Sequence, residues 1–394
     1  MTNNIHDPYG LSRRRFLQVS GLAAGGMALA ACGGDDAGTA TTAAAAPATT
    51  AAGGTTETTA AGMAIPQSDL EVVRFDFNTP NPNLQAPYWV GISKGWFAEV
   101  GIDLRPENIT GLDEYLPPMF AGQIDVALMD AVVIFPSEDA SVLDGTPNGL
   151  RWIGCALGYQ PIIMIANEGV TAENLAGKTV GLARAGTTNE VLAKFALSEM
   201  GYDWQTDVNA VNLTGGSNDW VTAMLTNQVD ATLAFPRHVA LAEEEGGGAI
   251  FTGFRMDPQA GWGMLQSKID EFPMFPVAWN YAYIKANNWC KDPANWEEIR
   301  EILTGEYNLD VPDNVFAAMP IDAGMMTEDL GWSPEAMDGL MAFSQPFGEY
   351  REDLPWRDYV YLDALYAAQE AHGMAPNPSA DLSTGETKAV PPEG

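Results

Sequence analysis

Between residues 71 and 245 the chain alternates short apolar runs with segments whose apolar residues recur at helical spacing. The runs are rich in β-formers and lie at 71–77, 102–104, 125–129, 152–157, 162–166, 179–183, 208–212 and 231–234. Helical spacing occurs between them, for example at 87–99, 188–200, 219–226 and 238–245. This alternation predicts an α/β protein of two domains, each a largely parallel sheet flanked by helices.

After Phe251 the alternation becomes less regular. The run Val277–Ile284 predicts one more strand, which we expect to return to the first domain, and helices follow to about His372. The chain should therefore cross between the domains near residues 167–172 and 273–278. Residues 374–394 are rich in Pro, Ser and Thr, which predicts a disordered tail.

Two export signals precede the folded part. The stretch Ser12–Gln18 is similar to the twin-arginine translocation consensus, and the apolar stretch behind it is shorter than the roughly 20 residues that span a bilayer. Leu29-Ala30-Ala31-Cys32 resembles a bacterial lipobox, which predicts cleavage before Cys32 and lipidation of its thiol. Residues 1–31 are thus predicted as a twin-arginine lipoprotein signal peptide and 32–66 as a disordered Ala/Thr/Gly linker. We expect an extracytoplasmic protein, lipid-anchored to the cell membrane.

Composition narrows the functional classes. The chain has 19 Lys and Arg against 52 Asp and Glu, a net charge of −33, which argues against nucleic-acid binding. Besides Cys32 it has Cys155 and Cys290, so no disulfide framework is predicted. With three His in the whole chain we expect no Ser-His-Asp set, no metal site and no cofactor. A hydrolase using paired carboxylates stays open as an alternative, because acids are abundant.

Four stretches carry a resemblance to a known family. They are 81–104, 121–127, 174–181 and 225–231. Their order and spacing resemble the ABC-transporter substrate-binding proteins of the nitrate, sulfonate and thiamine-pyrimidine type. The resemblance implies a two-lobed type II periplasmic-binding-protein fold, with lobe one from 67–170 plus 275–373 and lobe two from 171–274.

The same resemblance implies a function. A monomer would hold a small ligand between its lobes and deliver it to ABC permease and ATPase subunits, and a sensor role with the same fold stays open. Some thiamine-pyrimidine relatives are enzymes with a cysteine-rich run. This chain lacks such a run, so we expect it not to be an enzyme.

Candidate ligand contacts lie where predicted strands end, because open parallel sheets bind ligands at that edge. In lobe one they are Asn81, Asn83, Gln85, Tyr88, Trp89, Asp130, Trp279 and Asn280. In lobe two they are Gly186, Thr187, Thr188, Gly216, Ser217, Trp220 and Arg237. Each has a plainer interpretation: the Thr residues as helix N-caps, Arg237 in an ion pair with a surface acid, and most Trp residues in the core.

The sequence favours a ring-containing ligand, such as a pyrimidine-like compound. Trp89, Trp220, Trp279 and Tyr88 offer flat faces, and the Asn and Gln side chains offer mixed donors and acceptors. The negative net charge lowers the local concentration of anions, although the helix start at 186–188 could still hold one anionic group. Truncating a stacking aromatic is therefore expected to weaken binding more than removing Arg237. A nitrate/sulfonate-type anion-binding protein of the same fold is the alternative.

Overall fold

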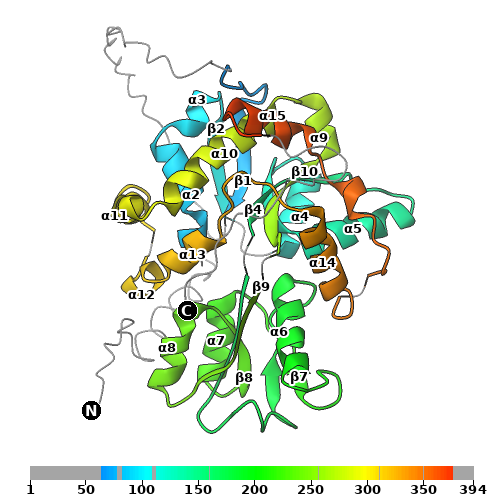
Figure 1. Cartoon of the computed structure of the whole chain (residues 1–394), viewed down its shortest axis with the longest axis vertical. Helices are drawn as coiled ribbons and strands as arrows, with labels where there is room; N and C mark the ends of the chain where they lie inside the picture. Colours follow the sequence, from blue (N-terminus) through cyan, green and yellow to red (C-terminus); the bar gives the residue numbers. More distant parts are fainter. Residues whose placement is uncertain are drawn as a thin grey trace, which may run out of the picture.

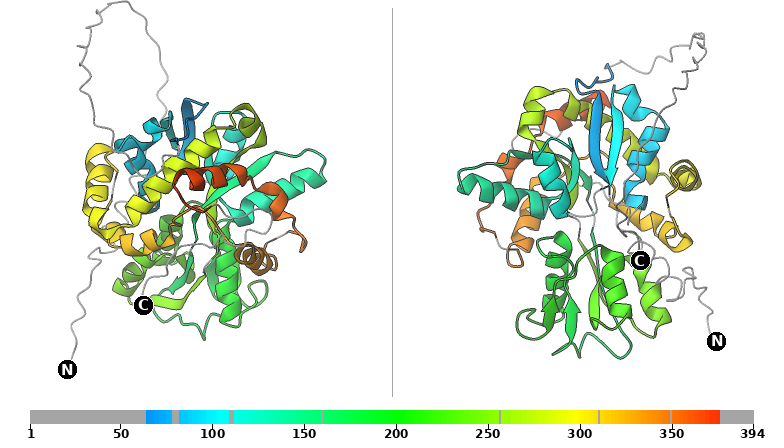
Figure 2. Two further views of the ribbon diagram at one scale, coloured as in Figure 1. Left: turned by 45° about the horizontal axis from the view of Figure 1, so that its top comes forward. Right: turned by 180° about the vertical axis from the view of Figure 1, so that it is seen from behind.

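The computed structural model describes residues 64–77, 82–108, 112–158, 160–255, 257–309, 311–348 and 350–375. They form two lobes, one above the other in Figure 1, and Figure 2 shows helices on either side of both sheets. The predicted signal peptide, Cys32, most of the predicted linker, Asn81 and most of the predicted tail lie outside these residues. Across the described ranges, no helix combines the length and apolar character that a membrane span requires.

Lobe one contains a two-stranded sheet, β2-β1, and a three-stranded sheet, β3-β10-β4, which lie side by side with β1 next to β3. Their bounds are β1 Val72–Phe77, β2 Asp103–Asn108, β3 Ala127–Asp130, β4 Leu150–Leu157 and β10 Ala260–Leu265. β1 pairs with β2 in parallel, and a parallel bridge between Phe75 and Val126 links β1 to the β3 side of the sheet. β10 pairs antiparallel with both β3 and β4, so it opposes the other strands.

Lobe two has one continuous sheet in the order β7-β6-β8-β5-β9. The strands are β5 Gln160–Ala166, β6 Thr179–Gly181, β7 Asn209–Val211, β8 Ala231–Ala234 and β9 Gly248–Arg255. β6 is parallel to β7 and β8, whereas β5 is antiparallel to β8 and β9. In each sheet the opposing strand enters from the other lobe. The predicted α/β architecture of two lobes with largely parallel sheets is thus confirmed.

Helices cover both sheets. In lobe two they are α6 Thr188–Glu199, α7 Ser217–Leu225 and α8 Pro236–Glu244. In lobe one they include α2 Pro82–Ser93, α3 Trp96–Glu99, α4 Leu112–Phe120, α5 Ala131–Leu143, α9 Gln266–Glu271 and α10 Phe275–Lys291. The chain then continues through α11 Trp296–Glu301, η2 Ile302–Glu306, α12 Asp313–Phe316, α13 Met319–Met325, α14 Pro334–Ser344, η3 Trp356–Tyr359 and α15 Asp363–Ala371.

The strand predicted at Val277–Ile284 is wrong, because these residues form the middle of helix α10. Most of α10 is buried, including Trp279, Asn280, Tyr283 and Ile284, since it packs against α2 and α15. A helix buried on most of its circumference has apolar residues at nearly every position. Such a continuous apolar run has no helical period and is indistinguishable from a buried strand by pattern alone.

The predicted crossing points also need correction. The chain crosses between the lobes after Leu157 and again before Ala260, because β4 and β10 belong to lobe one whereas β5 and β9 belong to the lobe-two sheet. The two crossings lie side by side: Leu157 pairs with Ala260, and Gln160 pairs with Arg255. We call this antiparallel pair of segments the crossing ribbon. The boundary predicted near residue 170 therefore moves to about 158, and β10 and α9 belong to lobe one.

A second link between the lobes comes from residues 343–348, which we call the strap. It consists of the last two residues of α14 in lobe one and the turn after them, and it lies against α6 of lobe two. Phe195 of α6 has its ring 4.8 Å from the ring of Phe343 and 6.4 Å from that of Phe347. Lys194 Nζ donates a hydrogen bond of 3.0 Å to the carbonyl oxygen of Phe347. The strap therefore buries aromatic surface of lobe one on lobe two.

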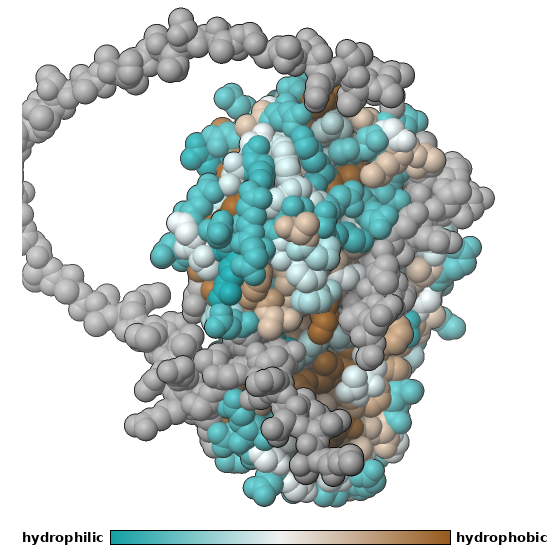
Figure 3. Space-filling model, turned by 60° about the vertical axis from the view of Figure 1, so that its left-hand side comes forward, coloured by the Kyte–Doolittle hydropathy of each residue, from teal (hydrophilic) through white to brown (hydrophobic). Residues whose placement is uncertain are grey.

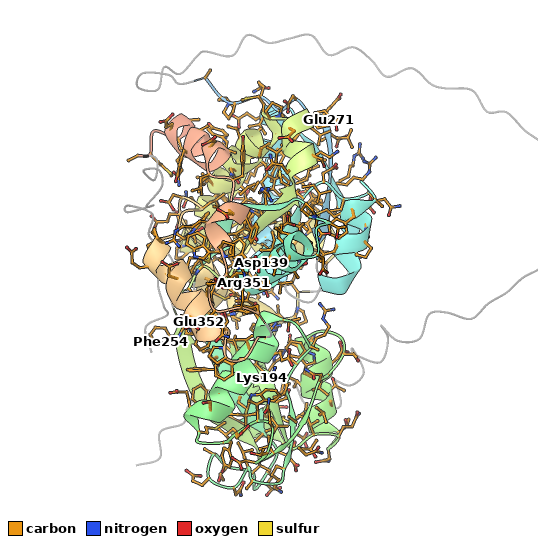
Figure 4. The ribbon with its side chains drawn as sticks, turned by 90° about the vertical axis from the view of Figure 1, so that its right-hand side faces the viewer. Asp139, Lys194, Phe254, Glu271, Arg351 and Glu352 are labelled. Atoms are coloured by element: carbon orange, nitrogen blue, oxygen red, sulfur yellow. The ribbon has the colours of Figure 1, made fainter. Side chains whose placement is uncertain are left out.

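Beyond the strap the chain returns to lobe one at Arg351. The Arg351 guanidinium donates to both carboxylate oxygens of Asp139 in α5, at 2.7 and 2.8 Å. Tyr359 Oη donates to the same carboxylate at 2.7 Å. Figure 4 shows Asp139 and Arg351 on the upper lobe and Lys194 on the lower one. The hydrogen bonds from Arg351 hold the pKa of Asp139 below its usual value.

Candidate ligand site between the lobes

Four strand ends lead into the junction of the lobes. β1 and β3 run into α2 and α5 in lobe one, and β6 and β8 run toward α6 and α8 in lobe two. β6 and β8 are hydrogen-bonded neighbours, and β1 lies beside β3. On the face shown in Figure 3, apolar surface gathers where the lobes meet. Side chains that follow these strands can therefore reach one ligand from both sides.

One direct contact joins the two lobes at this junction. Thr188, the first residue of α6, donates through Oγ1 to Asp130 Oδ2 at 2.6 Å. Asp130 ends β3 in lobe one. Burial raises the pKa of Asp130 to about 6, against the opposing hydrogen bonds from Thr188 and the charge of Arg184. The structure thus brings together two residues that the sequence proposed from different lobes.

A second group at the junction contains two buried charges. Arg237 of α8 is 3% exposed and donates through Nη2 to Ser217 Oγ at 2.9 Å. Asp322 of α13, in lobe one, is 4% exposed and accepts from Asn83 Nδ2 at 2.8 Å. Burial raises the pKa of Asp322 to about 6, and the charge of Arg237 opposes this rise. The two side chains interact electrostatically, yet no direct ion pair joins them within the described chain.

Much hydrogen-bonding capacity at this junction is unused by the described residues. The guanidinium of Arg237 has several N–H donors and makes one described hydrogen bond, to Ser217. Asn83 Oδ1 is buried without a partner. Gln160, at the crossing ribbon and 2% exposed, has neither amide atom paired. Each unpaired buried polar atom costs about 1–3 kcal/mol, so a ligand that pairs with them would recover this free energy.

Trp220 also lies near the strand ends. β5 side chains alternate between two apolar clusters on opposite faces of the sheet, with Ile162 in one and Ile163 in the other. Trp220 belongs to the first cluster, whereas Val221 from the same helix belongs to the second. The indole therefore packs with the cluster on the first face, and its Nε1 is buried without a partner.

The helix start at 186–188, which was predicted to hold an anionic group of the ligand, already forms hydrogen bonds within the protein. The Gly186 N–H donates to Glu190 Oε2 at 2.7 Å, and Thr187 Oγ1 caps the helix by accepting from the Glu190 N–H at 3.3 Å. The Gly216 N–H at the start of α7 donates to Asp219 Oδ2 at 2.8 Å. Since carboxylates already hold these amides, the structure assigns Gly186, Thr187 and Gly216 to helix capping.

Several predicted lobe-one contacts belong to the core instead. The ring of Tyr88 lies 4.4 Å from that of Phe75, and the ring of Trp279 lies 5.3 Å from that of Trp262. Asn280 Nδ2 donates to the Ile153 carbonyl oxygen at 2.8 Å. The positions of Trp279 and Asn280 follow from α10 being a helix in the lobe interior and not a strand that ends at the junction.

Two further predicted contacts lie on α2. Trp89 is 5% exposed, and its ring lies 4.6 Å from that of Tyr307 in lobe one. Gln85 is also buried, at 5% exposure. The ring contact with Tyr307 is a contact of Trp89 within lobe one.

His238, the third residue of α8, has a structural role. Its Nδ1 accepts from the Phe235 N–H at 3.2 Å, and its Nε2 lies 3.0 Å from Asn218 Oδ1, to which it donates when neutral. Burial and the charge of Arg237 hold the pKa of His238 well below its usual value. In the part of the chain that the structure describes, no cluster of three or more His, Cys, Asp or Glu is arranged for a metal ion.

Sequence reasoning missed Asp322 and Gln160. Asp322 lies 239 residues from Asn83, in a helical region without a recognisable motif, so no local signal marks it. Gln160 interrupts an otherwise apolar run before Ile162, and a polar residue at that place is the one signal that could have identified it.

Comparisons with known proteins agree with this architecture. Residues 77–304 match the NMT1-like family. The periplasmic nitrate-binding protein NrtA from Synechocystis PCC 6803 has a similar structure, with a TM-score of 0.63 and 16% identity over 81% of this chain and 94% of that one. The aliphatic sulphonate binding protein SsuA from Escherichia coli gives 0.57 and 15% over 74% and 92%.

An enzyme shares the fold as well. The desulfurization enzyme DSZB gives a TM-score of 0.52 and 12% identity over 77% of this chain and 100% of that one. No curated protein matches the chain by sequence. At these identities the structural likenesses establish the fold.

Proposed function

The chain belongs to the NMT1-like family, and on this premise we propose that it is the extracytoplasmic solute-binding component of an ABC importer. It captures a small nutrient between its lobes and presents it to permease and ATPase subunits. The observation that carries this proposal is the group of buried, incompletely paired polar side chains that both lobes supply at the junction. A ligand that contacts both lobes favours the closed arrangement, since it gains those contacts only there.

The structure supports a charged polar ligand more strongly than the ring-containing ligand that the sequence favoured. Tyr88 and Trp279 lie in the lobe-one core, so a pyrimidine-like or other ring-containing compound is now supported mainly by Trp220. The buried charges of Arg237 and Asp322 give stronger support to a polar ligand that carries charge.

Capture without turnover is part of the proposal. Burial raises the pKa of the thiols of Cys155 and Cys290, so neither supplies a thiolate near neutral pH. The pKa of His238 is also held well below its usual value, and its two ring nitrogens already contact Phe235 and Asn218.

Small-angle scattering tests lobe closure. A compound released from the natively purified protein by unfolding, identified by mass spectrometry and added back after refolding, is expected to lower the radius of gyration and to be recovered unmodified. Arg105→Ala, which removes an exposed lobe-one charge paired with Asp103, should behave as wild type. An unchanged radius of gyration at saturation would contradict closure, and a chemically altered compound would indicate an enzyme.

We also propose that Cys32 is the lipid-modified N-terminus of the exported protein, on the strength of the lipobox-like Leu29–Cys32 behind a twin-arginine stretch. Cys32→Ala should move the protein from the membrane fraction to the soluble fraction, while Thr41→Ala in the linker should leave it membrane-bound. Intact-mass analysis that finds an unmodified Cys32 in membrane-bound wild type would refute the anchor.

A further inference from the structure

We infer that the ligand between the lobes is zwitterionic, with an anionic group held by Arg237 and Ser217 of lobe two and a cationic nitrogen held by Asp322 and Asn83 of lobe one. This inference rests on the proposed function and narrows its ligand to a chemical class.

The lobe-two side requires a negative partner. Arg237 is almost fully buried, and an arginine side chain stays protonated in proteins, so its charge must be compensated inside the protein. Its described hydrogen bond goes to the neutral hydroxyl of Ser217, and Phe235 presents a ring 4.9 Å from the guanidinium carbon. Asp322 is the acid whose charge acts on Arg237, but it does not contact it. An anionic ligand group would accept the unused N–H donors directly.

The lobe-one side of the site requires a ligand group that donates hydrogen bonds and accepts none. Asn83 Nδ2 donates both to Asp322 Oδ2 at 2.8 Å and to the Val315 carbonyl oxygen at 2.7 Å. Two acceptors on this nitrogen fix the orientation of the amide, so the unpaired atom is the carbonyl oxygen Oδ1. That oxygen and the carboxylate of Asp322 together form a set of acceptors. An ammonium or amidinium group, which carries donors alone, fits this set.

A ligand with a single charge would satisfy one side at the expense of the other. A simple anion at Arg237 would lie near the carboxylate of Asp322, and a simple cation at Asp322 would lie near the guanidinium. Each case leaves one buried charge without compensation, which costs several kcal/mol. A zwitterion compensates both charges and keeps the junction neutral, because Arg237 and Asp322 are themselves one positive and one negative group.

Calorimetry with matched probes tests the inference. The panel contains α- and ω-amino acids and 2-aminoethanesulfonate, the corresponding desamino acids and ethanesulfonate, simple amines, and neutral pyrimidines. We expect at least one zwitterion to bind wild-type protein more tightly than its desamino and amine counterparts. Asp322→Asn should weaken the zwitterion about 10- to 100-fold and leave the desamino anion equal or tighter. A purely structural role for Asp322 would weaken both.

Two further variants keep the test decisive. Ser217→Ala should weaken the zwitterion and its desamino anion by similar factors, because it acts on the shared anionic group, and it serves if Asp322→Asn does not fold. Asp338→Asn, on the exposed side of α14, should change neither. Tightest binding by a single-charge or neutral compound would overturn the inference and leave the proposed function standing. Absence of binding by every probe, with no compaction by scattering, would count against both.

Discussion

Arg237→Gln is expected to weaken ligand binding by about 2–5 kcal/mol. This is the cost of removing one partner of a buried, hydrogen-bonded charge pair, here the pair that the Arg237 guanidinium forms with the anionic group of the ligand. The substitution keeps a side chain that can donate to Ser217, so packing at the start of α8 is preserved. What it removes is the positive charge that the ligand's anionic group and Asp322 both experience. Calorimetry with the compound released from wild-type protein measures the effect.

The same substitution at a remote arginine provides the control. Arg357→Gln removes a half-exposed charge on lobe one that pairs with Asp338, and it should leave the affinity unchanged. Equal affinities of the two variants would show that Arg237 is not a ligand contact. The expected result reverses the order predicted from the sequence, in which a stacking aromatic mattered more than Arg237.

Thermal stability without ligand is expected to fall as the pH rises from about 4 to about 7, in part because of Asp130. Its pKa is raised from 3.8 to about 6, so the native protein holds this proton more tightly than the unfolded chain. The stabilisation is complete below the unfolded pKa and is lost as the pH rises through the native one. Each pKa unit corresponds to 1.36 kcal/mol, so the contribution is up to about 3 kcal/mol, less because Asp130 is partly exposed.

Unfolding curves between pH 4.5 and 8 provide the measurement. Asp130→Asn should raise stability at pH 7.5 and reduce the slope with pH, and adding Asp322→Asn should reduce it further, because that pKa is raised in the same direction. Asp139→Asn is the control for which the opposite change in stability is expected. The pKa of Asp139 is lowered in the native protein, so removal of its charged carboxylate should destabilise the protein at pH 7. Identical slopes for wild type and Asp130→Asn would contradict the prediction.

The fold was largely predictable from the sequence, because strands and helices alternate in each lobe and most of them show the spacing of apolar residues that is typical of their type. The rule that ligands lie at strand ends also selected Asp130, Thr188, Ser217 and Arg237, which the structure places at the junction. It failed for Trp279, because the buried helix α10 has no helical period in its apolar pattern.

Other parts of the site follow from distant contacts and not from local patterns. Asp322 is recruited by Asn83 from the far end of the chain. Composition could not distinguish the ring of Tyr88 in the core from that of Trp220 near the junction, since both are buried aromatics of similar character. The first crossing point was misplaced because only four residues separate the apolar runs at 152–157 and 162–166, so no linker composition marks the change from one sheet to the other.

The strap affects both the affinity for the ligand and the rate at which the ligand is released. Opening the lobes about the crossing ribbon requires the hydrogen bond from Lys194 and the packing of Phe343 on Phe195 to be broken. The empty protein therefore spends more time closed than the ribbon alone would allow. Apparent affinity scales with the fraction of molecules already in the binding-competent arrangement, so this bias lowers the cost of capture. It also lengthens the residence time of the ligand, because release then requires the strap to separate from α6.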